Sequence, residues 1–135
     1  MRNIKPDLIL PDFNRTGFYT RNFHRTEVEC KGVNCCGHAA PMNLDLMGRA
    51  QALRDHIERA EGHTIPLHIN SGFRCPKHNA ATPGSSSTSL HMLGMALDFR
   101  RPGELSSTTF ARYAAMFFPK VIVYSWGIHA DVRFW

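Results

Sequence analysis

A histidine and a carboxylate stand close together in the segment Ser89-Leu90-His91-Met92-Leu93-Gly94-Met95-Ala96-Leu97-Asp98. After Gly94 the residues alternate between a hydrophobic set and a more polar set, which is typical of a β-strand with one face in a core. Asp98 falls on the face opposite Leu97 and Phe99. An imidazole and a carboxylate placed in this way can hold a metal ion such as zinc.

The end of the chain repeats the alternation and supplies a third candidate ligand. Over residues 127–134 hydrophobic and more polar positions alternate, so His129 and Asp131 share one face of a predicted strand. A catalytic zinc site usually takes three protein ligands and keeps a fourth position for water. The three candidates are His91, Asp98 and His129. A structural alternative needs no metal, because the first histidine can cap a loop while the carboxylate pairs with Arg100.

A second group of potential ligands lies in Cys30-Lys31-Gly32-Val33-Asn34-Cys35-Cys36-Gly37-His38. Its thiols and imidazole can hold a structural zinc ion, or the thiols can form a disulfide with one another or with Cys75. The spacing matches no standard zinc knuckle. The default expectation is free thiols packed as small hydrophobic side chains, as suits a reducing cytosol.

Two helices are expected to cover the strands that carry these residues. Asn43 is a typical N-cap for a helix that ends at Gly62, and Ser106 or Ser107 caps a second helix that ends at Pro119. Arg49 is expected on the outside of the first helix. The apolar stripes are Leu46, Ala50, Leu53, Ile57 and Ala60 in the first helix, and Phe110, Tyr113, Ala114 and Phe117 in the second.

The strands are expected to make a small sheet. Besides the two strands described above, residues 65–73 and 121–124 are predicted as buried strands, and residues 75–81 as a short helix. A loop of small and polar residues, 82–89, then delivers His91. This order predicts the α+β class: a single compact domain with a small, mainly antiparallel sheet, two main helices and the zinc site at the sheet face.

Length and composition agree with one domain. Residues 1–22 mix prolines, aromatic residues and arginines without a sustained period and are predicted to form an N-terminal arm, which leaves 23–135 as the domain proper. No apolar run approaches the roughly 20 residues that span a bilayer, and the N-terminus lacks the hydrophobic region of a secretory signal. We therefore expect a soluble monomer that is made in the cytoplasm and is not inserted in a membrane.

The charge of the chain favours an anionic partner. A net charge of +5 attracts polyanions such as nucleic acid, a membrane surface or an anionic cell-wall polymer. The basic residues are scattered, however, and no nucleic-acid motif accompanies them. We therefore expect no nucleic-acid partner.

Three segments together resemble one family. They are Ser71-Gly72-Phe73-Arg74-Cys75-Pro76, then Ser89-x-His91-x-x-Gly94-x-Ala96-x-Asp98, then Gly127-Ile128-His129-Ala130-Asp131-Val132-Arg133. From about Phe23 to Trp135 the chain resembles the D-Ala-D-Ala carboxypeptidase-like (LAS-type) zinc peptidases, which include bacteriophage endolysins and bacterial cell-wall endopeptidases. The resemblance implies that residues 23–135 are a zinc peptidase domain, with zinc (Zn²⁺) bound by His91, Asp98 and His129, and with Arg74 beside the substrate carbonyl.

The resemblance leaves the proton-transferring group open. In several relatives the general base lies three residues before the last zinc ligand, where this chain has Trp126, which cannot accept a proton. Asp131 lies on the same predicted strand face as His129 and is our candidate base. Its alternative roles are to orient a ligand histidine or to pair with Arg133.

The implied function is hydrolysis of peptide bonds in the stem peptides of bacterial peptidoglycan. A phage endolysin, an endopeptidase that lyses the host cell, agrees best with the basic charge and the absence of a secretory signal. A D,D-carboxypeptidase or a virion-associated lysin would use the same residues. The alternative of another class is a non-catalytic cell-wall-binding module, for which Trp126 in place of an acidic residue is the main argument.

Overall fold

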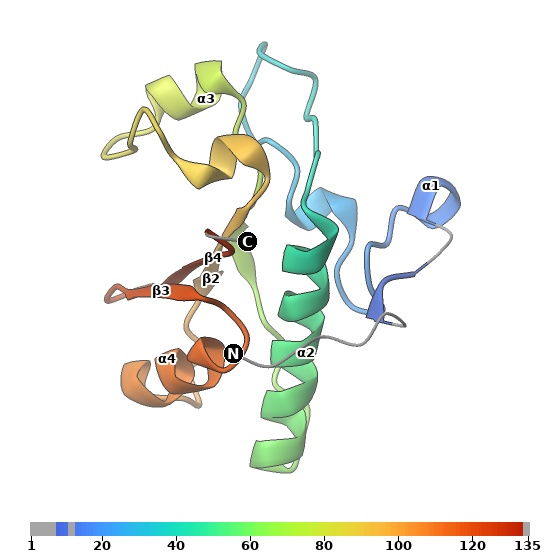
Figure 1. The fold of residues 1–135 in the computed structure, drawn as a ribbon, viewed down its shortest axis with the longest axis vertical. Coiled ribbons are helices and arrows are strands. Elements are labelled where there is room, and N and C mark those ends of the chain that lie inside the picture. Colours follow the sequence, from blue (N-terminus) through green and yellow to red (C-terminus); the bar gives the residue numbers. More distant parts are fainter. Residues whose placement is uncertain (1–7, 11–12, 134–135) are drawn as a thin grey trace.

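The computed structural model describes residues 8–10 and 13–133, so the first residues of the predicted arm and residue 134 of the predicted last strand lie outside it. The main elements are the helices α2 (Leu44–Glu61) and α4 (Ser107–Ala115) and the strands β1 (Ile69–Ser71), β2 (Ala96–Arg100), β3 (Lys120–Val123) and β4 (Gly127–Asp131) (Figure 1). Shorter elements are α1 (Phe13–Thr16), η2 (Arg25–Glu27), α3 (Pro76–Ala81) and η3 (Leu90–Leu93). The α+β class is confirmed.

The four strands form one sheet in the order β1-β2-β4-β3, and each neighbouring pair is antiparallel. The pairing of β2 with β4 places Asp98 opposite His129 and Leu97 opposite Ala130. Because side chains alternate along a strand, the polar pair and the apolar pair lie on opposite faces. The predicted alternation of both strands is confirmed.

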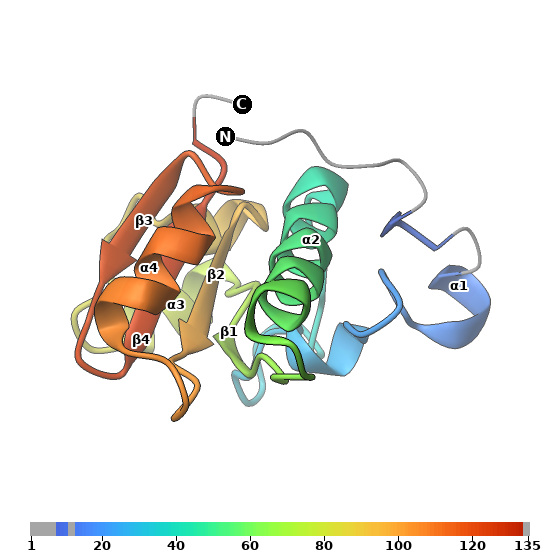
Figure 2. The ribbon, with the colours of Figure 1, turned by 90° about the horizontal axis from the view of Figure 1, so that it is seen from below.

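The two main helices pack on the apolar face of this sheet. In Figure 2, α2 lies beside β1 and β2, while α4 lies over β3 and β4. One buried core joins both helices to the sheet, and it includes Leu46, Leu53, Ile57, Leu97, Phe99, Phe110, Ala114, Ile128 and Ala130. The opposite face is therefore left for polar side chains.

The ends of the helices follow the predicted signals. The Asn43 side chain accepts a hydrogen bond from the Leu46 N–H, and Gly62 ends α2 in a left-handed conformation (φ 81°). Ser106 accepts from the Thr109 N–H at the start of α4, which ends at Ala115, short of the predicted Pro119.

Two predictions about α2 are wrong. Arg49, expected on the outside, is buried, and its guanidinium donates to Asp45 in the preceding turn and to the carbonyl of Phe117. Burial is possible because both groups accept hydrogen bonds from the charged head. Ala60, expected in the apolar stripe, is exposed, because the core ends one turn earlier at Ile57.

The predicted strands 65–73 and 121–124 also differ from the structure. Only Ile69–Ser71 pair in the first, with a shift of register between these residues, although Leu67 and Ile69 are buried as expected. The second runs from Lys120 to Val123 and is not buried, because β3 is the edge of the sheet and Val123 is half exposed.

Part of the predicted arm packs against the domain. The ring of Phe13 in α1 stacks on Tyr19, with 4.2 Å between the ring centroids, and Tyr19 is buried in the main core. The boundary between an arm and a domain at residue 23 stays a prediction. Within the described ranges no helix is both long and apolar enough to cross a membrane.

Candidate metal centre

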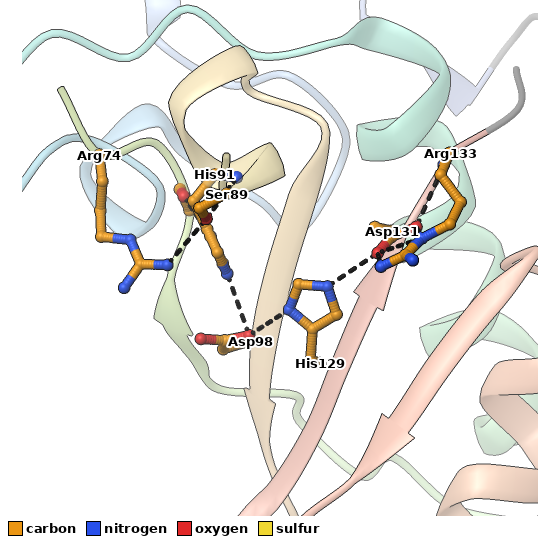
Figure 3. Close-up of polar contacts among 8 residues, drawn as sticks. Arg74, Ser89, His91, Asp98, His129, Asp131 and Arg133 are labelled. Atoms are coloured by element: carbon orange, nitrogen blue, oxygen red, sulfur yellow. Dashed lines mark hydrogen bonds and ion pairs between the residues drawn. The ribbon is translucent and has the colours of Figure 1, made fainter. Parts of the chain in front are cut away.

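The structure brings the three predicted ligands together on the polar face of the sheet (Figure 3). An oxygen of Asp98 on β2 lies 3.2 Å from Nε2 of His91 and 3.1 Å from Nδ1 of His129 on β4. One ligand atom from each residue lies within 4.8 Å of the others. Asp98 therefore pairs with the two histidines. Among the described contacts it has no pair with Arg100, which the metal-free alternative required.

His91 is positioned by the short helix η3. The Ser89 hydroxyl accepts a hydrogen bond from the His91 N–H, and Gly94 ends the helix with φ 67°. A side chain at residue 94 would bring a Cβ to 2.0 Å from the carbonyl oxygen of Pro41, so both the conformation and the space require glycine. The His91 ring itself is buried and sits 2.7 Å from the Gly72 carbonyl through Nδ1.

The partner of each histidine decides which nitrogen faces Asp98. A carbonyl only accepts, so Nδ1 of His91 donates to Gly72 and the other nitrogen, Nε2, turns a lone pair toward Asp98 in the neutral ring. Nε2 of His129 lies 2.8 Å from Asp131, and its Nδ1 faces Asp98. Two ring nitrogens and a carboxylate oxygen that converge in this way need a cation or shared protons between them. This donor set fits zinc.

Asp131 lies behind His129 and is fully buried. Its carboxylate accepts from Nε2 of His129 and, at 2.7 to 2.9 Å, from the guanidinium of Arg133. A carboxylate that holds the far nitrogen of a ligand histidine fixes the tautomer and the orientation of the ring. Asp131 therefore contacts both Arg133 and the candidate ligand His129, as two of its predicted roles require.

Ionisation of these groups follows from the same contacts. Burial by itself raises the pKa of Asp98, but its contacts with the imidazoles of His129 and His91 lower it to about 2. Burial lowers the pKa of His129, but its hydrogen bonds to Asp131 and Asp98 raise it to about 9. Burial raises the pKa of Asp131, whereas His129 and Arg133 hold it well below its usual range. In the metal-free protein at neutral pH, an imidazolium therefore lies between two carboxylates.

Arg74 reaches the same site from the segment after β1. Its Nη2 donates to the Ser89 hydroxyl at 3.2 Å, while its buried Nε has no hydrogen-bond partner among the described residues. Burial lowers the pKa of Arg74, although the Asp98 charge opposes this shift. A buried guanidinium donor without a partner is costly, which makes Arg74 a candidate to bind an oxygen of a ligand.

A family comparison agrees with this geometry. The family model for Peptidase M15 matches residues 18–129, a range that begins before the predicted domain start and ends at the last candidate ligand. The chain belongs to the peptidase M15 family. The predicted relationship to D-Ala-D-Ala carboxypeptidase-like zinc peptidases is thereby confirmed. Family membership makes the chain a zinc-dependent metallopeptidase for peptidoglycan-type substrates. A search of curated proteins found no match.

The three candidate ligands of this M15 peptidase line a cleft of about 840 Å³. One wall is the predicted loop 82–89, and the other is the β3–β4 hairpin, which contributes Ile122, Tyr124 and Trp126. The rings of Tyr124 and Trp126 stack with centroids 5.1 Å apart, and both side chains are exposed.

The two aromatic side chains are the part of this M15 site that sequence reasoning missed. Trp126 entered only as the residue in place of an acidic base, and Tyr124 only as the end of a buried strand. The available signal was a pair of large aromatic side chains on either side of Ser125, at the turn that precedes His129.

Proposed function

We propose that the protein hydrolyses peptide bonds in the stem peptides of bacterial peptidoglycan, with zinc held by His91, Asp98 and His129. The observation that carries this proposal is the convergence of the three ligand atoms in a cleft, with the outer nitrogen of each histidine already occupied by an acceptor. Zinc, when bound, polarises the scissile carbonyl and lowers the pKa of its water toward roughly 7. The remaining steps depend on the residues around it.

Arg74 is the proposed substrate-binding cation. Its partly unpaired guanidinium lines the cleft together with the three ligands. Such a group can stabilise the negative charge that develops on the carbonyl oxygen, or it can hold a terminal carboxylate in a bidentate pair. The first use suits an endopeptidase, and the second suits a D,D-carboxypeptidase.

Asp131 is proposed to act first as a positioning residue for His129. It is fully buried, it is absent from the lining of the cleft, and both of its oxygens accept hydrogen bonds from Arg133 or His129. A general base needs to reach the proton that it removes, directly or through one water. The role of Asp131 as general base stays a competing prediction.

The proposed setting is lysis of a bacterial cell by a phage endolysin that works as a monomer. The net charge of +5 supports attraction to an anionic wall after release from the cytoplasm. A virion-associated lysin would have the same site and a different route to the wall.

Digestion of purified peptidoglycan tests the proposal. We expect the protein to release new amino and carboxyl ends, identified by mass spectrometry, to lose this activity with a chelator, and to regain it with zinc. His129→Ala should be inactive, while His63→Ala is the matched control, because His63 is exposed and pairs with Glu104 outside the cleft.

Three results would change the assignment. Cleavage that resists the chelator would overturn the zinc mechanism. Binding to peptidoglycan without turnover would instead favour the non-catalytic wall-binding module. Release of only the terminal D-alanine would identify a carboxypeptidase.

A further inference from the structure

A second group of potential ligands shares no residue with the metal centre. It consists of all four cysteines of the chain, Cys30, Cys35, Cys36 and Cys75. Their sulfur atoms all lie within 4.8 Å of one another, although the first three belong to the loop before α2 and Cys75 belongs to the start of α3. We call this group the cysteine cluster.

The spacing of the sulfur atoms distinguishes a metal site from a disulfide. The Sγ atoms of Cys30 and Cys35 are 3.9 Å apart, as are those of Cys35 and Cys36. A disulfide requires about 2.05 Å. Four thiolates at about 2.3 Å from a tetrahedral zinc ion lie about 3.8 Å from one another. These two distances match the edges of a zinc-thiolate tetrahedron, and the other sulfur pairs lie within 4.8 Å.

The loop that carries three of the cysteines is folded around the sulfur atoms. Residues 28–43 contain no regular helix or strand, and Asn34 and His38 have left-handed backbones (φ 56° and 59°) without being glycine. At Gly32 an added Cβ would lie 2.6 Å from the Sγ of Cys35. This conformation has a cost that few apolar contacts offset, because the cluster forms only a small separate core with Phe73 and partly buried neighbours.

Two donors of α3 lie at the cluster or at the loop that carries it. The His78 N–H donates to the sulfur of Cys75 at 3.5 Å, and Nζ of Lys77 donates to the carbonyl of Asn34 at 3.0 Å. Figure 1 shows the loop before α2 running beside α3. Four thiolates around one zinc ion carry two net negative charges, so an N–H donor to sulfur and a nearby ammonium group stabilise that state.

We propose that the cysteine cluster binds a second zinc ion with a structural role. Four protein ligands leave no open position for water or substrate, which is the feature that separates structural from catalytic zinc sites. The ion would join the loop before α2 to Cys75, next to Arg74. The same stretch is tied to the metal centre, because the Arg74 N–H donates to the carbonyl of His91. The second zinc would thus support the wall of the cleft without taking part in hydrolysis.

Metal content and cobalt spectroscopy test this proposal. We expect two zinc ions per wild-type chain. The variant His91→Ala/His129→Ala should keep one, and Cys35→Ser/Cys36→Ser should also keep one. Cobalt in the histidine variant should give a thiolate-to-metal charge-transfer band and the intense visible bands of a tetrahedral site, whereas cobalt in the cysteine variant should give no thiolate band. His38→Ala is the matched control, because His38 adjoins the cluster without belonging to it, and it should keep both ions.

The cobalt spectrum of the wild-type protein keeps the proposal testable if a cysteine variant does not fold. Absence of a thiolate band in a protein that holds one metal ion per chain would overturn the proposal. An intact mass lower by two hydrogens per bridge would show a disulfide and would also overturn it. None of these measurements depends on peptidase activity, so they are independent of the proposed function.

Discussion

The candidate metal centre and the cysteine cluster are both sets of converging potential ligands, but the chain builds them in opposite ways. Asp98 and His129 face each other through strand register, and each histidine is held from behind by a carbonyl or a carboxylate. The cysteine cluster sits on irregular loop backbone around a small core. The contrast suggests that the sheet can hold the first site without its ion, whereas the loop depends on the ion for its shape.

The largest expected effect is the loss of activity when a candidate ligand of the metal centre is removed. His129→Ala should lower peptidase activity by at least about 10³-fold, out of an enhancement that is typically 10⁶-fold or more. The zinc-free variant should stay folded, because the strand pairing does not depend on the ring, and its melting temperature should fall only by the contribution of the His129 imidazolium. Activity and thermal unfolding, measured on the same preparation, check this. A variant that unfolds would show that the sheet itself depends on the site.

The opposite result is expected at the cysteine cluster. An ion present at 1,000 times its dissociation constant stabilises a fold by about 4 kcal/mol, and Cys75→Ser should lose much of this contribution. Activity per folded molecule should stay within about tenfold of wild type. Val33→Ala is the control, because Val33 lies on the same loop and is exposed. If Cys75→Ser left stability unchanged and abolished activity, the cysteine cluster would serve hydrolysis and not the fold.

Arg74 connects the two regions, since it precedes Cys75 and lines the cleft. Removing one donor to a developing oxyanion lowers kcat by about 10²–10³-fold. We expect Arg74→Ala to lower kcat by a factor in this range. If Arg74 stabilises the oxyanion, kcat falls for internal and terminal peptide bonds alike. If it binds a terminal carboxylate, KM rises, and only for substrates with a free carboxyl end. Arg100→Ala on β2, which is exposed and does not line the cleft, should leave both constants unchanged.

The stability of the metal-free protein should depend on pH through His129. Folding raises the pKa of His129 from 6.5 to about 9, so its imidazolium stabilises the metal-free fold below pH 6.5, and this contribution is lost as pH rises through 9. The loss is at most about 3 kcal/mol at 1.36 kcal/mol per pKa unit. Melting temperatures of chelated protein between pH 6 and pH 9.5 should fall accordingly. His129→Gln should remove this dependence.

The sequence was sufficient to predict that the three candidate ligands lie together, because they belong to alternating strands and to a local capping motif. Asp98 and His129 could be placed on one face by parity, and Ser89 and Gly94 mark the short helix that carries His91. The burial of Arg49 could not be predicted, because its guanidinium donates to the carbonyl of Phe117, which is distant in the sequence.

The cysteine cluster shows a similar limit. Its fourth sulfur, from Cys75, joins the others only through tertiary structure, so the local spacing matches no standard zinc knuckle. The prediction that the strand at 121–124 is buried was wrong for a related reason. Hydrophobicity indicates a strand but does not show that it lies at the edge of the sheet.

The smallest effect is expected at Asp131, where position and proton transfer can be separated. Loss of a carboxylate behind a ligand histidine typically costs 10–100-fold in metal affinity, so Asp131→Ala should weaken zinc binding by this amount. Asp131→Asn keeps an oxygen that accepts from Nε2 of His129 and should retain most of the affinity. If positioning is its role, zinc-saturated Asp131→Asn should keep activity within about tenfold of wild type, with an unchanged pH profile.

A general base would respond differently to the same pair of variants. An amide cannot take up a proton at neutral pH, so Asp131→Asn would then be as inactive as Asp131→Ala even with zinc bound, and the loss would reach about 10²–10⁴-fold. That result would give Asp131 the role that an acidic residue at position 126 fills in several relatives. Retained activity in the amide variant would instead mean that His129, held between two carboxylates, is positioned by one of them and shares the metal with the other.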